Sequence, residues 1–247
     1  MIKINKTLII DSERYLTGKY KGVQKWKKYQ LDANKHYASA SAIAYNFGSG
    51  YEVFRQELLN DQGPKCCYCE KGIENGEIEH YRPKGTCQQA RGGAKINPGY
   101  YFLVYRWKNL LISCGECNAS GQKGILFPIN GPSRATCLTE LDQEDPVIIN
   151  PAFDAPEDHI TFNEDIPVRI TDRGQENIDI FKLTDRGDIA NSRRDRFMLY
   201  KREKQLLNAG LLTYIEEVEA KRIIKNATKD KHPFSGMIRA NLKKGIL

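Results

Sequence analysis

Two cysteine pairs limit what this chain can fold into more than any other feature of its sequence. Cys66 and Cys69 form one Cys-x-x-Cys pair, and Cys114 and Cys117 form a second. Four thiolates in two such pairs are the ligand set of a closed, tetrahedral zinc site, so we predict a structural zinc ion here. Simple zinc ribbons separate their pairs by about 15 to 20 residues, but 44 residues, 70–113, lie between these pairs. We therefore expect a further element inside the span that the zinc site closes.

The other cysteines and the N-terminal sequence indicate a reducing compartment. Seven cysteines are an odd number, and most of them lie in two tight clusters, which argues against a disulfide framework. Cys67 has the wrong spacing to replace Cys66 as the partner of Cys69, and Cys87 and Cys137 are expected to be ordinary core or loop residues. The first residues carry too short an apolar run for a signal peptide, and no stretch approaches the roughly 18 apolar residues of a membrane span. The sequence therefore predicts a cytoplasmic protein without membrane contact.

The net charge of +7 is unevenly spread along the 247 residues. Residues 1–36 carry +6 and residues 182–247 carry +8, so residues 37–181 carry −7. Basic ends around an acidic centre suit a protein whose flanks hold a polyanion while central carboxylates hold a metal. Lysine-rich helices with solvated faces explain the same distribution equally well, so charge alone leaves both interpretations open.

Apolar spacing predicts helices before the first cysteine pair. Residues 18–46 have an apolar residue every third position from Tyr20 to Trp26, with lysines off this stripe, which favours a helix. A second, shorter helix is expected over 51–60. Residues 1–62 are thus predicted to form an N-terminal basic helical region.

The second half of the chain predicts a connector, a small sheet and basic helices. Residues 128–151 are rich in Pro, Gly, Asp and Asn, which is typical of a connector. Alternating apolar residues predict a small antiparallel sheet with strands near 160–162, 166–170 and 178–180. From residue 186 the pattern is helical and basic. Its apolar stripe, interrupted near Gly210, consists of Phe197, Tyr200, Leu207, Leu211, Tyr214 and Val218.

The span between the cysteine pairs, extended slightly past the second pair, contains a series of motifs. In order, they are Glu79-His80, Asn109-Leu110, Cys114-Gly-Glu-Cys-Asn118 and Lys123-Gly124. This series resembles the HNH nuclease family over residues 65–128. The resemblance implies an α+β fold with a zinc-clipped ββα-metal core at 63–130, whose first strand ends near His80 and whose helix starts near Cys117. Helical flanks would surround this core, with the connector, the small antiparallel sheet and the basic helices in residues 131–247.

Phosphodiester hydrolysis explains why these residue types are needed. It requires an activated water on one side of the phosphorus and stabilisation of the leaving oxygen on the other. A neutral imidazole accepts a proton near pH 7, and His80 is the one histidine within the cysteine span, so it is the predicted general base. A catalytic magnesium or manganese ion prefers oxygen ligands, and the resemblance assigns Glu79 and Asn118 to it. The resemblance also assigns Asn109 to fixing the loop that orients the imidazole.

Three basic residues, Arg82, Lys84 and Lys123, are candidate phosphate-binding groups, although a solvated-face interpretation of each is equally open. The sequence departs from the common family pattern at three positions. Glu79 replaces the usual aspartate, Asn118 stands where many members have histidine, and Lys123 lies at least one residue beyond the usual place of the family lysine.

Motifs outside the core narrow the resemblance to one branch of the family. The segments 79–85, 100–114, 123–129, 145–162 and 193–196 resemble the PtuB nuclease subunits of Septu-type and retron-associated antiphage systems. This resemblance implies a PtuA-type ATPase as partner and, in retron systems, a reverse transcriptase with its RNA-linked DNA. It also implies an effector nuclease that is held inactive until a phage trigger releases it.

Two alternatives to a DNA-cleaving HNH enzyme remain open from the sequence. RNA, for example transfer RNA, is one, because such a site needs only an accessible phosphodiester and RNA recognition depends on other surfaces. The second is a zinc-stabilised nucleic-acid-binding or scaffold protein with a degenerate pocket. Substitution of His80 by alanine separates the enzyme from the binding module, since a binding module should keep its effect.

Overall fold

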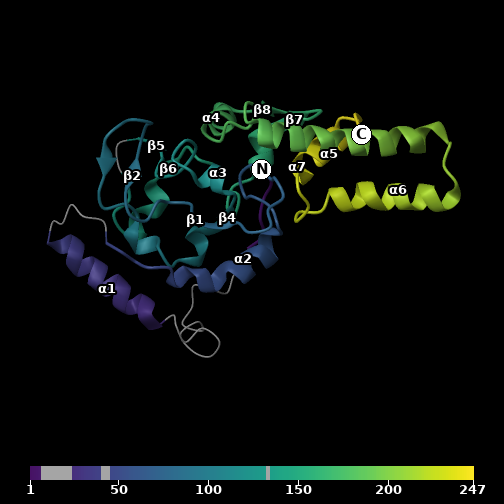
Figure 1. The fold of residues 1–247 in the computed structure, drawn as a ribbon. Helices are drawn as coiled ribbons and strands as arrows, with labels where there is room; N and C mark the ends of the chain where they lie inside the picture. Colours follow the sequence, from purple (N-terminus) through teal and green to yellow (C-terminus); the bar gives the residue numbers. More distant parts are fainter. Residues whose placement is uncertain (7–23, 40–44, 132–133) are drawn as a thin grey trace. The chain divides into compact units, whose positions relative to one another are not determined.

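Helices and short antiparallel strands make up the part of the chain that the computed structural model describes, residues 1–6, 24–39, 45–131 and 134–247 (Figure 1). The α-helices are α1 (Gln24–Ala38), α2 (Arg55–Gln62), α3 (Gly115–Asn118), α4 (Asp172–Ile180), α5 (Gly187–Ala209), α6 (Tyr214–Ala227) and α7 (Ser235–Lys243). The 3₁₀ helices are η3 (Gly50–Phe54), η4 (Tyr101–Leu103), η5 (Trp107–Asn109), η6 (Leu138–Gln143) and η7 (Pro156–Asp158). The predicted α+β class is confirmed at this level.

Each strand of the described residues pairs with one other strand, always antiparallel. The pairs are β1 (Glu77–His80) with β4 (Leu110–Ser113), β2 (Cys87–Gln88) with β3 (Lys95–Ile96), β5 (Ile129–Asn130) with β6 (Asp145–Pro146), and β7 (Ile160–Asn163) with β8 (Ile166–Arg169). Such short ribbons gain little stability from their own hydrogen bonds, so each depends on the side chains packed against it.

The chain folds as two compact units that interleave along the sequence. The central unit contains Asn5–Asp61 and Glu77–Ile148, and the C-terminal unit contains Met1–Ile4, Gln62–Gly76 and Ile149–Leu247. This division reflects which residues pack against one another. The three ranges expected from the sequence, 1–62, 63–130 and 131–247, remain a prediction about where separate functions lie.

In the central unit, the β1–β4 ribbon pairs Glu77 with Ser113 and His80 with Leu110. All four residues of β4 are buried, which supplies the apolar support that a two-stranded ribbon needs. The predicted strand end at His80 is confirmed. The predicted helix near Cys117 is found as α3, which begins two residues earlier at Gly115 and ends after one turn at Asn118. Cys114 caps this turn, since its sulfur accepts a hydrogen bond from the Cys117 N–H.

The two predicted N-terminal helices are found with changed limits. Of the helix expected over 18–46, the structure describes α1, which ends at Ala38, while 45–47 are not helical. Residues 18–23 and 40–44, with Tyr20 and Val23 of the expected stripe, lie outside the described residues. The helix expected over 51–60 is confirmed as η3 followed directly by α2. In the expected connector 128–151, the regular elements among the described residues are β5, η6 and β6.

In the C-terminal unit, the predicted sheet of three strands has two. Strands β7 and β8 form as expected, but the third apolar alternation, Ile178 and Ile180, lies in helix α4. Thr171 caps this helix by accepting a hydrogen bond from Gly174 N–H at 3.1 Å. A Cβ on Gly174 would lie 2.0 Å from the carbonyl oxygen of His159, so this position requires glycine. Two apolar residues at spacing two fit a helix turn as well as a strand, and the cap decides between them.

Helices α5 and α6 lie antiparallel, joined by a turn at Gly210 (Figure 1). Gly210 has φ of +65°, a left-handed conformation that ends α5. Only the first part of the expected apolar stripe is buried, at Phe197 and Tyr200, which pack in a core with Phe162, Phe234, Met237 and Ile238. The expected interruption near Gly210 is confirmed, because α6 starts a new helix with its own capping box at Thr213. Beyond Tyr200 the stripe is not buried: Leu207 is half-buried, and Leu211, Tyr214 and Val218 are exposed.

None of the described helices is both long and apolar enough to cross a membrane.

Candidate functional site

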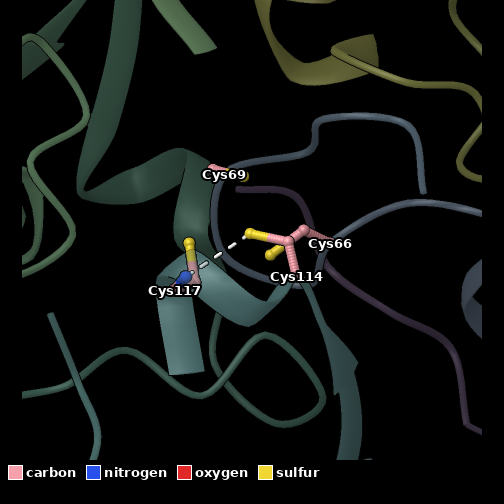
Figure 2. A group of neighbouring side chains, drawn as sticks. All are labelled: Cys66, Cys69, Cys114 and Cys117. Atoms are coloured by element: carbon pink, nitrogen blue, oxygen red, sulfur yellow. Dashed lines mark hydrogen bonds between the residues drawn. The ribbon is translucent and has the colours of Figure 1, made fainter. Parts of the chain in front are cut away.

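The four predicted zinc ligands lie together. Cys66, Cys69, Cys114 and Cys117 are all buried, and their sulfur atoms lie within 4.8 Å of one another (Figure 2). Zinc–sulfur bonds of about 2.3 Å in a tetrahedron place the sulfurs about 3.8 Å apart, so this donor set fits a structural zinc ion. Cys67 and Cys87 are buried and Cys137 is exposed, and none of them belongs to the cluster.

The turn that carries the first pair has a fixed backbone. Cys66 N–H donates to the Lys71 carbonyl at 2.9 Å, and Glu70 N–H donates to the Cys66 carbonyl at 3.0 Å. Glu70 takes a left-handed conformation with φ of +61°. Its carboxylate is buried and paired with the ammonium of Lys65 at 3.1 Å. Backbone turns of this kind direct both thiols of a pair to one side, as a metal knuckle requires.

His80 ends β1 and is buried, with 8% of its surface exposed. Its Nε2 lies 2.9 Å from the carbonyl oxygen of Val104. A carbonyl only accepts hydrogen bonds, so Nε2 carries the proton and Nδ1 of the neutral ring is the basic nitrogen. The ring of Tyr51 packs edge-on against the imidazole, with centroids 4.7 Å apart.

The pKa of His80 is lowered to about 3, mainly by burial and also by the positive charges of Lys84 and Lys123, while the hydrogen bond to Val104 opposes this shift. Because burial disfavours the charged imidazolium, the ring is neutral at pH 7. A neutral ring is the form that accepts a proton. His80 is therefore in the protonation state that a general base needs.

Glu79 forms a buried ion pair. Its Oε1 lies 2.5 Å from Nζ of Lys123, and both side chains are almost fully buried. The same ammonium donates to the carbonyl oxygen of His80 at 2.9 Å. Lys123 thus ties the carboxylate of Glu79 to the main chain of His80, and its charge offsets the cost of burying that carboxylate.

Asn118 lies at the end of α3, and its amide Nδ2 donates to Oε2 of Glu77 at 2.7 Å. Alternate side chains of a strand face opposite ways, so Glu77 and Glu79 share one face of β1. The structure thus places the predicted ligand Asn118 beside Glu77, a carboxylate that the motif comparison did not include. The two-residue spacing from Glu79 is the sequence signal that could have identified it.

Asn109 clamps the loop that follows β1. Its Oδ1 accepts from Arg82 N–H at 2.8 Å, and its Nδ2 donates to the Arg82 carbonyl at 3.1 Å. Its own carbonyl accepts from Tyr81 N–H at 2.9 Å. These bonds hold the backbone of Tyr81 and Arg82, the two residues that directly follow His80.

The three candidate phosphate-binding residues all have partners within the protein. Lys123 pairs with Glu79, and Arg82 donates through Nε to the buried carboxylate of Glu144 at 2.8 Å. Lys84 donates to the hydroxyl of Tyr51 at 2.6 Å and lies over its ring. Neither Tyr51 nor Glu144 was identified from the sequence, because both come from segments without a motif.

The fold and this arrangement define a class: an α+β protein with a buried four-cysteine cluster suited to zinc and a buried histidine at the end of a two-stranded ribbon. Within that class, the chain is homologous to two curated proteins, each named Septu protein PtuB. One is from Bacillus mycoides (strain KBAB4), with 36% identity over 145 residues, 54% of this chain and 49% of the relative. The other is from Bacillus thuringiensis, with 33% identity over 115 residues, 45% of this chain and 33% of the relative. The resemblance to PtuB predicted from the sequence is confirmed.

The chain spans about half of the first relative's length and about a third of the second's. No family model matches the chain, and no solved structure matches it.

Proposed function

We propose that the chain is a metal-dependent endonuclease of the HNH type that hydrolyses phosphodiester bonds. The observation that carries this proposal is the state of His80, a buried and neutral imidazole whose Nε2 is committed to Val104. Its Nδ1 is left to take the proton of an attacking water. A bound phosphodiester brings negative charge to the ring, which raises the imidazole pKa and makes it a stronger base.

The carboxylate and amide oxygens of Glu79 and Asn118 would hold the divalent cation, magnesium or manganese, with Glu77 as a further carboxylate beside Asn118. This cation would neutralise the charge that develops on the leaving oxygen. Asn109 positions the imidazole by holding the loop after β1. Lys123 is buried, so we propose that it orients Glu79 and His80 and does not clamp phosphate.

Homology to Septu protein PtuB supports a role as a Septu-type component. We propose that the chain is the effector nuclease of a bacterial antiphage system and works with a PtuA-type ATPase. The four-cysteine centre would hold structural zinc and so fix the turns before β1 and after β4.

DNA is the substrate we favour, with RNA as the alternative. One experiment tests reaction and substrate together. Zinc-loaded protein, alone and with its PtuA-type ATPase, is incubated with plasmid DNA and with total RNA, in magnesium-free buffer and with added magnesium. We expect magnesium-dependent cutting of one substrate by wild type and by His36→Ala, but not by His80→Ala. Equal cutting by wild type and His80→Ala would exclude His80 as the base, and binding without cutting would favour the scaffold alternative.

A further inference from the structure

A cavity of about 360 Å³ lies between α5 and α6, with α7 contributing one residue to its wall. Its lining combines apolar and basic side chains in comparable number. Leu207, Ile224 and Leu242 are the apolar part, and Lys204, Lys221 and Lys225 are the basic part. We call this site the α5–α6 groove. The volume falls in the range of small-ligand sites, roughly 300 to 1,000 Å³, so the groove accommodates a group about as large as one nucleotide.

Two of the three lysines have no internal counter-charge. Lys221 pairs with Glu217, which also lines the groove. Lys204 of α5 and Lys225 of α6 make no side-chain hydrogen bond or ion pair with any residue that the structure describes. The groove therefore presents two uncommitted ammonium groups, one from each helix, at the edge of an apolar surface.

We propose that the α5–α6 groove binds a single-stranded segment of nucleic acid. Lys204 and Lys225 contact backbone phosphates, and an unpaired base lies against Leu207, Ile224 and Leu242. This inference rests on the proposed function for the identity of the ligand class, and it adds a second contact for the nucleic acid in the C-terminal unit.

Charge and shape together select this ligand. Helix α5 has six Lys or Arg against three Asp or Glu, and this net positive charge attracts a phosphate backbone. A duplex keeps its base faces stacked inside, so it cannot place the face of a base against the apolar part of the groove. A single strand offers both groups within one nucleotide, as proteins that bind single strands exploit.

Binding is measured with the full-length, zinc-loaded His80→Ala protein in magnesium-free buffer, by fluorescence anisotropy of a labelled 12-nucleotide single strand and of its duplex. The test variant is Lys204→Glu/Lys225→Glu, with Lys204→Gln/Lys225→Gln as a milder form. The matched control is Arg202→Glu/Lys229→Glu, which changes charge equally at two exposed positions outside the groove. Circular dichroism and melting temperature verify that all variants are folded.

We expect the glutamate test variant to weaken single-strand binding at least tenfold, and the control at most threefold. The dependence of log Kd on log salt should also fall by about 1.4 for two lost phosphate contacts on a single strand. Equal weakening by test and control variants, or tighter binding of duplex than of single strand, overturns the inference. So does absence of single-strand binding by the parent protein. Because binding is measured without catalysis, its result is independent of whether wild type cleaves nucleic acid.

Discussion

Around the β1–β4 ribbon, charged side chains are buried in pairs: Lys123 with Glu79, and Arg82 with Glu144. Along the α5–α6 hairpin, charged side chains other than the buried Arg193 are exposed or half-buried, and some apolar side chains are exposed too: Leu211 is 77% exposed and Tyr214 is 80% exposed. A buried charge needs a partner at a defined distance, because an unpaired one is very costly. The ribbon is thus built to hold a few groups in one geometry, whereas the hairpin offers surface that its own unit does not use.

The largest expected effect concerns the cysteine centre. Cys114→Ser removes one of four thiolates, so zinc binding and the folding free energy that it supplies should be lost together. We expect less than one zinc per chain by elemental analysis and a melting temperature lower by more than 10 °C, since about 1 kcal/mol corresponds to 2–4 °C at this chain length. Cys137→Ser, at an exposed cysteine outside the cluster, is the control and should bind zinc normally. Normal zinc content in Cys114→Ser would remove the four-cysteine assignment.

A matched pair of glutamate substitutions compares the two regions directly. Glu144 is buried and accepts hydrogen bonds from Arg82, Tyr100 and Ala135, so Glu144→Gln should lower the free energy of unfolding by about 3 kcal/mol. Glu219, exposed on α6, pairs only at the surface with Arg222, and Glu219→Gln should leave stability unchanged. Urea unfolding of both variants gives the two values. Similar losses of unfolding free energy in the two variants would mean that the ribbon depends on its charged pairs no more than the hairpin does.

Substitution of two asparagines, Asn109 and Asn241, distinguishes a residue that positions His80 from one that only stabilises the fold. Asn109 binds both the N–H and the carbonyl of Arg82, and Asn241 of α7 binds both the N–H and the carbonyl of Glu164. Alanine at either position leaves buried polar groups unsatisfied and should cost about 2 kcal/mol. Only Asn109→Ala should also slow cleavage, by about tenfold or more, because only its clamp lies next to His80. Equal cleavage rates of Asn109→Ala and Asn241→Ala would mean that Asn109 stabilises the fold and does not position His80.

The smallest effect tests a partly exposed pair in the C-terminal unit. Hydrogen bonds from Arg186 lower the pKa of Asp188 to about 2; partial burial opposes this, and Lys71 adds to it. A lowered carboxyl pKa stabilises the fold at pH values above the unfolded pKa of about 3.9, and this stabilisation is lost as pH falls towards 2. Asp188→Asn should therefore cost about 0.5 kcal/mol at pH 6 after solvent screening, and progressively less below pH 4. A loss of stability in Asp188→Asn that increases as the pH falls would contradict this prediction.

Local spacing in the sequence was enough to predict the cysteine cluster and the long basic helix α5, whereas the end of β1 at His80 was predicted from the family resemblance. In the first two cases a short segment determines the outcome: a Cys-x-x-Cys knuckle, or a helix period sustained over several turns. Helix α4 was missed because two isoleucines two residues apart fit either element, and the cap at Thr171 decides.

The partners of the site residues could not be predicted in the same way. That Lys123 pairs with Glu79, that Asn118 contacts Glu77, and that the ring of Tyr51 covers His80 all depend on packing between distant segments. Motif spacing identifies which residue types are present and leaves their neighbours unspecified. The exposure of Leu211 and Tyr214 was missed for a related reason: the helix turns at Gly210, and the apolar pattern beyond it belongs to another helix.

The central claim is that His80 is the general base of a phosphodiester hydrolase. Single-turnover cleavage by zinc-loaded wild type and His80→Ala, with magnesium and the substrate that wild type cuts, tests it most directly. The account predicts a rate for His80→Ala that is lower by about 10² to 10⁴, with zinc content and melting temperature close to those of wild type. A His80→Ala rate within twofold of wild type would contradict the account.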